Sequence, residues 1–292
     1  MNGVLNIDKP AGMTSHDVVG RVRRIAKQKR VGHSGTLDPD ATGVLVVCLG
    51  SATRIADLLA DAGKRYRCVL VLGAQTDTED ASGAVTAEVD AGNITEQDLR
   101  AVLPLFTGDI MQVPPMVSAV HHEGKRLYEL ARAGVTVERA ARPVTIVALQ
   151  LVDFTPGHKP TATLDIGCSK GTYIRTLCAD LGRSLGVGGH MGALRRTAVG
   201  IFTVDDAVPL DALDAETLAS KLVPASEALD LPRTVLVDQA RVDDIRHGRS
   251  VPAGDQSEDS IVQIVDASGE LLALAKVAEG RLRPYKVFAT AE

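Results

Sequence analysis

The chain is poor in aromatic residues and lacks the signals of several protein classes. Its 292 residues include no Trp, four Tyr and four Phe, so each aromatic side chain is informative. No segment approaches the roughly 18 to 20 apolar residues that a membrane helix needs. The N-terminus MNGVLNIDKP has no basic segment followed by an apolar one, which argues against a secretory signal. We therefore expect a soluble, cytoplasmic protein.

Cysteine usage and cofactor motifs exclude further classes. The cysteines form no C-x-x-C pair, which argues for free thiols in a reducing compartment and against a zinc site; they are Cys48, Cys68, Cys168 and Cys178. G-x-x-x-x-G-K-S/T and H-E-x-x-H do not occur, and GVGGHMG at 186–192 departs from G-x-G-x-x-G. We expect neither nucleotide-dependent nor zinc-dependent chemistry.

Charge is unevenly distributed along the chain. The net charge is −5, but residues 226–292 carry twelve Asp and Glu against eight Lys and Arg, which leaves the first 225 residues close to neutral. Within these, RVRRIAKQKR at 21–30 holds six basic residues and no acidic one. This run is either a face that contacts nucleic-acid phosphates, with Arg21 and Arg24 as candidates, or the solvated face of a helix.

The order of the elements favours an α+β fold. Strands and helices are mixed without strict alternation, which predicts a large mixed, mainly antiparallel sheet flanked by helices. Helices are expected at 14–30 with Thr14 or Ser15 as N-cap, at 52–62 with Ser51 as cap, at 95–106 with a Thr95–Asp98 capping box, and at 172–185. Short alternating strands in the tail predict a small β-rich domain over 226–292, following a larger domain over 1–225.

The loop GHSGTLDPDATGVLVV at 32–47 holds two aspartates among glycines and a proline. Asp38 precedes Pro39, which biases its backbone towards extended geometry, and an apolar strand follows. On composition alone, Asp38 and Asp40 could form ordinary Asx turns in a surface loop. A carboxylate on such a rigid support could instead act as a base or a nucleophile.

Six blocks carry a family resemblance, and they occur in the family's order. They are LNIDKPAGMTSHDVV, GHSGTLDPDATGVLVVCLGSATR, KRYRCVLVLGAQTDTEDASG, QVPPMVSAVHHEGKRLYELARAG, CSKGTYIRTLCADLG and GGHMGALRRTAVG, covering nearly all of residues 3–202. The chain resembles the TruB family of tRNA pseudouridine-55 synthases. The resemblance implies the pseudouridine synthase fold, a C-terminal PUA-like domain, and isomerisation of uridine 55 in the tRNA T loop. It also implies that the glycosidic bond is cleaved, the base turns and rejoins through C5, and no cofactor is needed.

The resemblance assigns three catalytic residues. Asp38 matches the catalytic aspartate of the G-T-L-D-P motif, on which cleavage of the C1′–N1 bond depends. Arg175 matches the arginine that pairs with this aspartate and holds it ionised and oriented. Tyr173 matches the residue packed against the flipped base, and on an extended segment it would point to the same side as Arg175. Without the resemblance, Arg175 reads as a member of a surface ion pair.

Five further residues match substrate-binding positions. Tyr66 matches the tyrosine that stacks on the target base, although an edge-strand tyrosine is the alternative. His33 matches a histidine that helps extrude RNA, or is an ordinary solvated loop residue. Leu194 matches an apolar residue of the uracil pocket, or is a core leucine. Lys9 and Asp80 match positions with RNA-contact or pocket-ordering roles.

The expected partner is the T-arm stem-loop of tRNA. Residues of about 121–142 match the family's RNA-clasping insertion, where Lys125, Arg126 and Arg132 could contact phosphate together with Arg21 and Arg24. The family suggests a monomer without an obligate protein partner. Two other functions remain open: a non-catalytic RNA-binding or RNA-folding protein, and a hydrolase that uses Asp38 and Asp40 as paired carboxylates.

Overall fold

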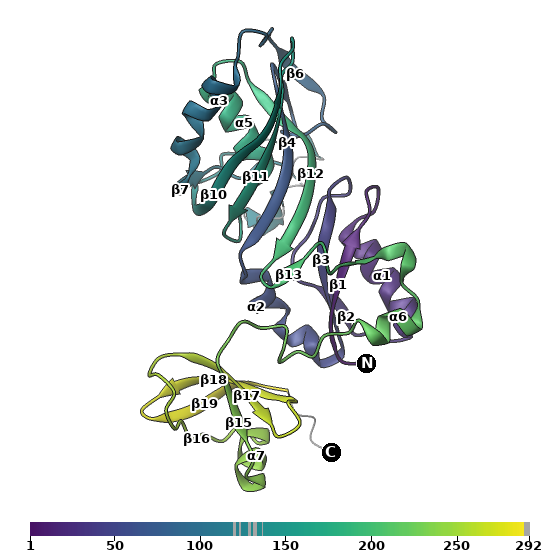
Figure 1. The fold of residues 1–292 in the computed structure, drawn as a ribbon, viewed down its shortest axis with the longest axis vertical. Coiled ribbons are helices and arrows are strands. Elements are labelled where there is room, and N and C mark those ends of the chain that lie inside the picture. The colour runs from purple at the N-terminus through teal and green to yellow at the C-terminus, as the bar shows by residue number, and fades with distance from the viewer. Residues whose placement is uncertain (119–120, 123, 128–129, 131–132, 136, 289–292) are drawn as a thin grey trace.

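The computed structural model describes residues 1–118, 121–122, 124–127, 130, 133–135 and 137–288. Its main feature is a ten-stranded sheet (Figure 1), with strand order β14-β1-β3-β12-β4-β11-β10-β7, while β13 pairs with β12 and β2 pairs with β3. Only the pairs β1/β14 and β12/β3 are parallel in this sheet, so the predicted mixed, mainly antiparallel sheet is confirmed. The strands are β1 (Gly3–Lys9), β2 (Val31–His33), β3 (Thr42–Leu49), β4 (Lys64–Leu72), β7 (Gly108–Gln112), β10 (Arg142–Thr155), β11 (Thr161–Cys168), β12 (Gly189–Val199), β13 (Phe202–Thr203) and β14 (Val208–Pro209).

The main sheet has two halves, one built around β1 and β3 and the other around β12, β4, β11 and β10. Helices cover both halves (Figure 1) and bury their apolar side chains against the sheet. Helix α1 (Ser15–Ala26) packs Val18 and Val22 against the half built from β1 and β3, in one buried cluster. Helix α5 (Ile174–Ser184) packs against the other half, beside α3 (Glu96–Val102). The remaining short helices are η1 (Gly50–Ile55), α2 (Ala56–Asp61), η2 (Leu103–Phe106), η3 (Leu210–Ala212) and α6 (Ala215–Ser220).

Local capping chemistry explains where two helices begin. The side chain of Thr14 accepts from Asp17 N, and Asp17 in turn accepts from Thr14 N, which forms a capping box at α1. The capping box of Thr95 and Asp98 at α3 is confirmed in the same geometry. Helix α1 ends at Ala26, because Lys27 has left-handed backbone geometry with φ of 50°. The basic residues after Ala26 therefore lie outside the helix, contrary to the expectation of a helix to residue 30.

The predicted cap at Ser51 is wrong. Residues 50–55 form the 3₁₀ helix η1, and Ser51 lies inside it instead of at its N-terminus. The Ser51 amide donates to Asn2 Oδ1 at 2.9 Å, so a side chain from the N-terminus satisfies this group. A partner distant in sequence has replaced the local cap.

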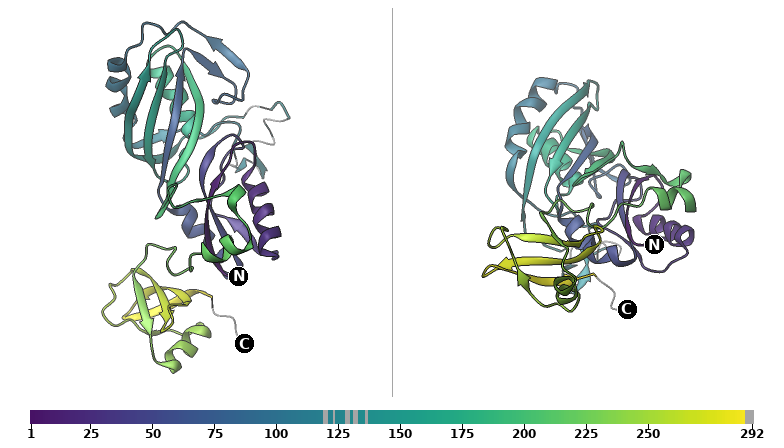
Figure 2. Two further views of the ribbon diagram at one scale, coloured as in Figure 1. Left: turned by 45° about the vertical axis from the view of Figure 1, so that its right-hand side comes forward. Right: turned by 60° about the horizontal axis from the view of Figure 1, so that its bottom comes forward.

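A second sheet of five strands lies at one end of the molecule (Figures 1 and 2), in the order β15-β17-β18-β19-β16. Its elements are β15 (Arg233–Leu236), α7 (Gln239–Arg246), β16 (Val251–Pro252), β17 (Ile261–Asp266), β18 (Leu271–Ala278) and β19 (Arg281–Val287). Lys286 Nζ lies 2.8 Å from the Asp57 carboxylate, and the Arg54 guanidinium lies 5.3 Å from the Phe288 ring centroid. These contacts join the second sheet to η1 and α2.

Two small sheets lie outside the two large ones. Two-stranded sheets pair β5 (Ala74–Thr76) with β6 (Val85–Glu88), and β8 (His121–His122) with β9 (Lys125–Arg126). All four cysteines are free and buried. Among the residues described, none of the helices combines the length and the apolar character required to cross a bilayer.

The two halves of the main sheet meet at one narrow junction. Strands β12 and β3 pair only through Arg195 with Thr42 and Arg196 with Gly43. A Cβ on Gly43 would lie 2.2 Å from the Arg196 carbonyl oxygen, and Gly43 has φ of 99°, so only glycine fits this crossing. The loop over 34–41 precedes this junction directly, which places it between the two halves.

Candidate active site

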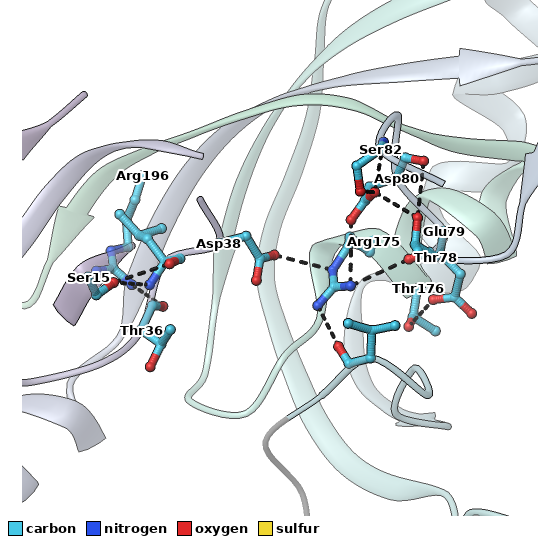
Figure 3. Close-up of polar contacts among 12 residues, drawn as sticks. Ser15, Thr36, Asp38, Thr78, Glu79, Asp80, Ser82, Arg175, Thr176 and Arg196 are labelled. Atoms are coloured by element: carbon cyan, nitrogen blue, oxygen red, sulfur yellow. Dashed lines mark hydrogen bonds and ion pairs between the residues drawn. The ribbon is translucent and has the colours of Figure 1, made fainter. Parts of the chain in front are cut away.

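Asp38 and Arg175 form an ion pair between the two halves of the sheet (Figure 3). Asp38 lies in the loop between β2 and β3, and Arg175 is the second residue of α5. Arg175 Nε lies 3.3 Å from an Asp38 carboxylate oxygen; the arginine side chain is 8% exposed and the aspartate side chain 44%. The carboxylate is therefore accessible from solvent while its cationic partner is buried behind it.

The other donors of Arg175 are occupied as well (Figure 3). Nη1 lies 3.5 Å from the Asp80 carboxylate and donates to the Thr78 carbonyl at 3.4 Å, while Nη2 donates to the Val117 carbonyl at 2.9 Å. Asp80 is itself held by the Thr78 and Ser82 hydroxyls at 2.7 and 2.6 Å. The guanidinium plane is therefore fixed, and Asp80 faces Arg175.

Every backbone carbonyl from residue 35 to residue 39 accepts a hydrogen bond. The donors come from β12, α1, β1, the turn after β1 and the loop itself: Arg196 to Gly35 and Thr36, Ser15 Oγ to Leu37, Ala41 N to Asp38, and both Lys9 Nζ and Gly12 N to Pro39. Ser15 Oγ also accepts from Leu37 N at 2.8 Å. A loop held at each carbonyl loses little conformational freedom on binding a substrate, which is the support that a reacting carboxylate requires.

Lys9 is fully buried, and its ammonium has a structural role. Nζ donates to the carbonyls of Pro10, Met13 and Pro39 at 2.9, 2.6 and 2.8 Å. Burial lowers the pKa of Lys9, and the nearby Asp40 and Asp38 oppose this shift. Of the two roles expected for Lys9, the buried position fits ordering of the pocket and leaves no surface for an RNA contact.

Tyr66 forms a buried wall beside this loop. It lies on β4 between β11 and β12 and is only 8% exposed, so the alternative of an edge-strand tyrosine is wrong. Burial raises the pKa of its hydroxyl, while the adjacent Arg196 guanidinium opposes that shift. Leu37 belongs to the same buried cluster, and Leu194 packs against it half-buried. The loop that carries Asp38 therefore shares, through Leu37, a buried cluster with Tyr66, and Leu194 packs against that cluster.

Tyr173 is the N-cap of α5, and the prediction that it shares an extended segment with Arg175 is wrong. The helix begins at Ile174, so Arg175 is already helical. Gln112 makes this start possible: its Oε1 accepts from Tyr173 N at 2.8 Å, and its Nε2 donates to Tyr173 O at 3.0 Å. A buried amide side chain from β7 thus satisfies the backbone of Tyr173.

His33 ends strand β2 and is half-buried, so the alternative of a fully solvated loop histidine is wrong. Burial lowers its pKa, and the Arg196 guanidinium acts in the same direction. Because the ordinary pKa of histidine is already about 6.5, this lowering favours the neutral imidazole at pH 7. A neutral ring suits stacking or hydrogen bonding better than an ion pair with phosphate.

The basic residues predicted to contact phosphate lie on different elements. Arg21 forms an ion pair with Asp211 at 2.7 Å, and Arg24 is exposed on α1. Lys125 and Arg126 form strand β9, whereas Arg132 lies outside the residues described.

Among the residues described, no group of three or more His, Cys, Asp or Glu side chains is arranged to hold a metal ion.

Two residues of the site were not predicted. Arg196 is 1% exposed and Gln112 is 2% exposed, and both bond to backbone groups of the site. In the sequence, Arg196 follows Arg195 and Gln112 follows an apolar strand residue, so neither stands out from a surface position. Only alternation along β12 hints that one arginine of the pair faces inward.

Comparison with known proteins gives consistent matches along the whole chain. The model of the TruB family pseudouridylate synthase (N terminal domain) matches residues 23–174. The tRNA pseudouridylate synthase B C-terminal domain matches 175–235, and the Pseudouridine synthase II TruB, C-terminal model matches 234–288. These three models together leave only the first 22 residues and the last four unmatched.

Relatives of known name are similar over most of their length. The tRNA pseudouridine synthase B of Symbiobacterium thermophilum is 52% identical over 241 residues, which covers 82% of this chain and 80% of that protein. The protein of the same name from Moorella thermoacetica is 45% identical, with 98% of each chain covered.

Two solved structures share the architecture. One is an H/ACA RNP bound to a substrate RNA containing 2′-deoxyuridine, with a TM-score of 0.73 and 25% identity over 99% of this chain and 85% of that one. The other is a Cbf5-Nop10-Gar1 complex, with a TM-score of 0.74 and 28% identity over 98% of this chain and 85% of that one.

Proposed function

Since the chain belongs to the TruB family of pseudouridylate synthases, we propose that it converts uridine 55 in the tRNA T loop into pseudouridine. The resemblance expected from the sequence is confirmed, as is the pseudouridine synthase fold with a separate β-rich C-terminal domain. The chain is an isomerase that forms pseudouridine in tRNA.

The observation that carries the proposal is the half-exposed Asp38 carboxylate against the buried Arg175 guanidinium. A carboxylate that remains accessible on one side can approach C1′ of a nucleotide, while the cation holds it ionised and aimed. The C1′–N1 bond is broken, the uracil turns, a C1′–C5 bond forms, and the C5 proton leaves as N1 gains one. The product is an isomer of the substrate, so the atoms balance without a cofactor.

The flanking residues supply a place for an extruded base. Tyr66 offers an aromatic face, Leu194 an apolar side chain and His33 a neutral ring, while Tyr173 caps α5 next to Arg175. We assign Tyr66, Tyr173 and Leu194 to the uracil pocket and His33 to extrusion of the nucleotide. Lys9 and Asp80 order this pocket through Pro39 and Arg175.

The RNA surface is proposed to extend beyond the pocket. Phosphates of the T arm would be contacted by Arg21, Arg24 and the insertion that carries Lys125, Arg126 and Arg132. Such contacts position RNA without reading its sequence.

We propose residues 1–225 as the catalytic domain and 226–292 as a PUA-like domain. Four buried free thiols suit a reducing cytoplasm, and the enzyme acts as a monomer without an obligate protein partner.

The decisive experiment uses an unmodified tRNA transcript. Wild-type protein should form pseudouridine at position 55, as mapped chemically, and Asp38→Asn should form none. Asp40→Asn is the matched control, since Asp40 lies two residues away and is exposed; it should retain activity. A transcript with cytidine at position 55 should yield no product.

The same experiment separates the other functions. A non-catalytic RNA-binding protein would bind the transcript and leave every uridine unchanged. A hydrolase with paired carboxylates would release free uracil and lose activity with either Asp38→Asn or Asp40→Asn. Pseudouridine formed equally well by wild type and by Asp38→Asn would refute the assignment of Asp38.

A further inference from the structure

Arg196 is a buried cation that the reaction as described does not use. Its side chain is almost fully buried, and burial lowers the pKa of the guanidinium. Its donors bond to backbone carbonyls, Nε to Val44 at 2.7 Å, Nη1 to Thr36 at 3.3 Å and Nη2 to Gly35 at 3.2 Å. The guanidinium also interacts with the Tyr66 hydroxyl, which opposes the lowering of its pKa. Burying a charge against neutral acceptors is costly, so an apolar residue would serve better if packing were the only requirement.

The acceptors of Arg196 lie on both sides of Asp38 along the chain. Gly35 and Thr36 precede the aspartate in its loop, and Val44 follows it in β3. One planar guanidinium therefore connects the two ends of the loop; Figure 3 shows Arg196 beside Thr36. Its separate donors keep the ends at a fixed spacing.

Arg196 also lies at the junction between the halves of the sheet. In register it is paired with Gly43 of β3 on one side and with Tyr66 of β4 on the other. Asp38 belongs to the half that carries β3, whereas Tyr66 belongs to the half that carries β4, against which α5 packs. The reacting carboxylate and the base-stacking face are thus connected through this one residue.

We propose that Arg196 is a positioning residue for the isomerisation, holding the Asp38 loop at a fixed place relative to Tyr66 and Arg175. The effect of Arg196 on the rate of pseudouridine formation rests on the proposed function. A lysine at this position could bond to one flank of the loop only, because its ammonium lacks the fork of a guanidinium. A methionine would fill the space and bond to neither flank.

The test compares Arg196→Met and Arg196→Lys with Arg195→Met. Arg195 is the matched control, because it is adjacent on β12 and pairs with Asp8 at 2.7 Å with its side chain 41% exposed. Three quantities are measured at a temperature where circular dichroism shows each protein folded: the single-turnover rate of pseudouridine formation, the tRNA Kd, and hydrogen exchange in peptides spanning 34–46.

We expect Arg196→Met to lower the single-turnover rate about 100-fold, the scale of a displacement of about 1 Å at a reacting group, with little change in tRNA Kd. Arg196→Lys should recover part of that rate, and exchange at Leu37 and Ala41 should accelerate in Arg196→Met alone. Arg195→Met should lower the rate by less than about fivefold.

A wild-type rate together with wild-type exchange in Arg196→Met would overturn the proposal, as would an equal loss in Arg195→Met. If Arg196→Met does not fold, the comparison is made with Arg196→Lys, and a wild-type rate of pseudouridine formation in that variant would overturn the proposal. If the wild type forms no pseudouridine, the proposed function fails, and unchanged exchange at 34–46 then overturns the positioning role separately.

Discussion

Arg175 Nε lies 3.3 Å from the carboxylate of Asp38, although 136 positions of sequence separate the two residues. The pair spans the two halves of the main sheet, with the cation on helix α5 and the anion on the loop before β3. Because the arginine side chain is buried and the aspartate is half exposed, substrate can reach only the carboxylate. This asymmetry distinguishes the pair from a surface ion pair.

Arg175→Lys should lower kcat by about 100-fold while tRNA binding changes little, because the ammonium cannot serve Asp38, Asp80 and the Val117 carbonyl together. The measurement is single-turnover pseudouridine formation beside tRNA binding. Arg183→Lys is the matched control on the same helix, since its side chain is 72% exposed and pairs with Asp180. Retention of the full rate in Arg175→Lys would mean that charge alone suffices.

Tyr66→Leu should reduce kcat/KM by roughly tenfold to hundredfold, because base stacking on an aromatic side chain contributes about 1 to 3 kcal/mol. Tyr66→Phe keeps the ring and should retain most of the activity. Tyr285→Leu removes a tyrosine that is 50% exposed on β19 and serves as the control. Equal activity of the Leu and Phe variants would contradict a stacking role.

Gln112→Leu should destabilise the protein by about 1 to 3 kcal/mol, because it leaves the N–H of Tyr173 without its partner. The Tyr173 carbonyl loses one of two donors and keeps Leu177 N at 3.1 Å. The measurement is urea unfolding at pH 7. Gln150→Leu, at an exposed position of β10, should change stability by less than about 0.5 kcal/mol. A similar stability of the two variants would show that water replaces the Gln112 amide.

The sequence predicts those features whose cause is local. The capping boxes at Thr14 and Thr95 need partners three residues away, and both are confirmed. The run KRYRCVLVLGAQT predicts one strand over 64–76, and the structure divides it into β4 and β5 at Gly73, whose φ is 83°. Ser51 shows the limit, because its amide is satisfied by Asn2, and no local pattern indicates that partner.

The site is predictable only in part, for the same physical reason. The motif resemblance identifies Asp38 and Arg175, but the distance between them depends on where α5 begins, and there the N-cap Tyr173 bonds to Gln112 from β7. Arg196 likewise owes its burial to the crossing of β12 over Gly43. When a side chain bonds to backbone groups that are distant in the sequence, no motif with fixed spacing marks it. Such contacts therefore cannot be predicted from the sequence.

Glu79 provides a test of electrostatics beside the ion pair. It has left-handed geometry with φ of 64°, and its carboxylate accepts from the Thr176 hydroxyl at 2.6 Å. Burial raises the pKa of Glu79; Asp180 acts in the same direction, while the Thr176 hydroxyl, Arg175 and Arg139 oppose it. The native state therefore holds this proton more tightly than the unfolded chain does.

Glu79→Gln should consequently be more stable than wild type at pH 7, where the native carboxylate carries a charge that burial disfavours. The wild type loses stability as pH rises from the unfolded pKa of glutamate, about 4.3, through the raised native pKa. The gap between the two proteins should therefore close at about pH 3.5, where both states of the wild type are protonated. The measurement is the thermal unfolding of both proteins across this pH range.

The control is Glu88→Gln, which removes an exposed partner of Lys159 at 2.9 Å and should stay within about 1 kcal/mol of wild type in stability. A Glu79→Gln protein that is less stable at pH 7 would show that attraction to Arg175 and Arg139 outweighs the cost of burial.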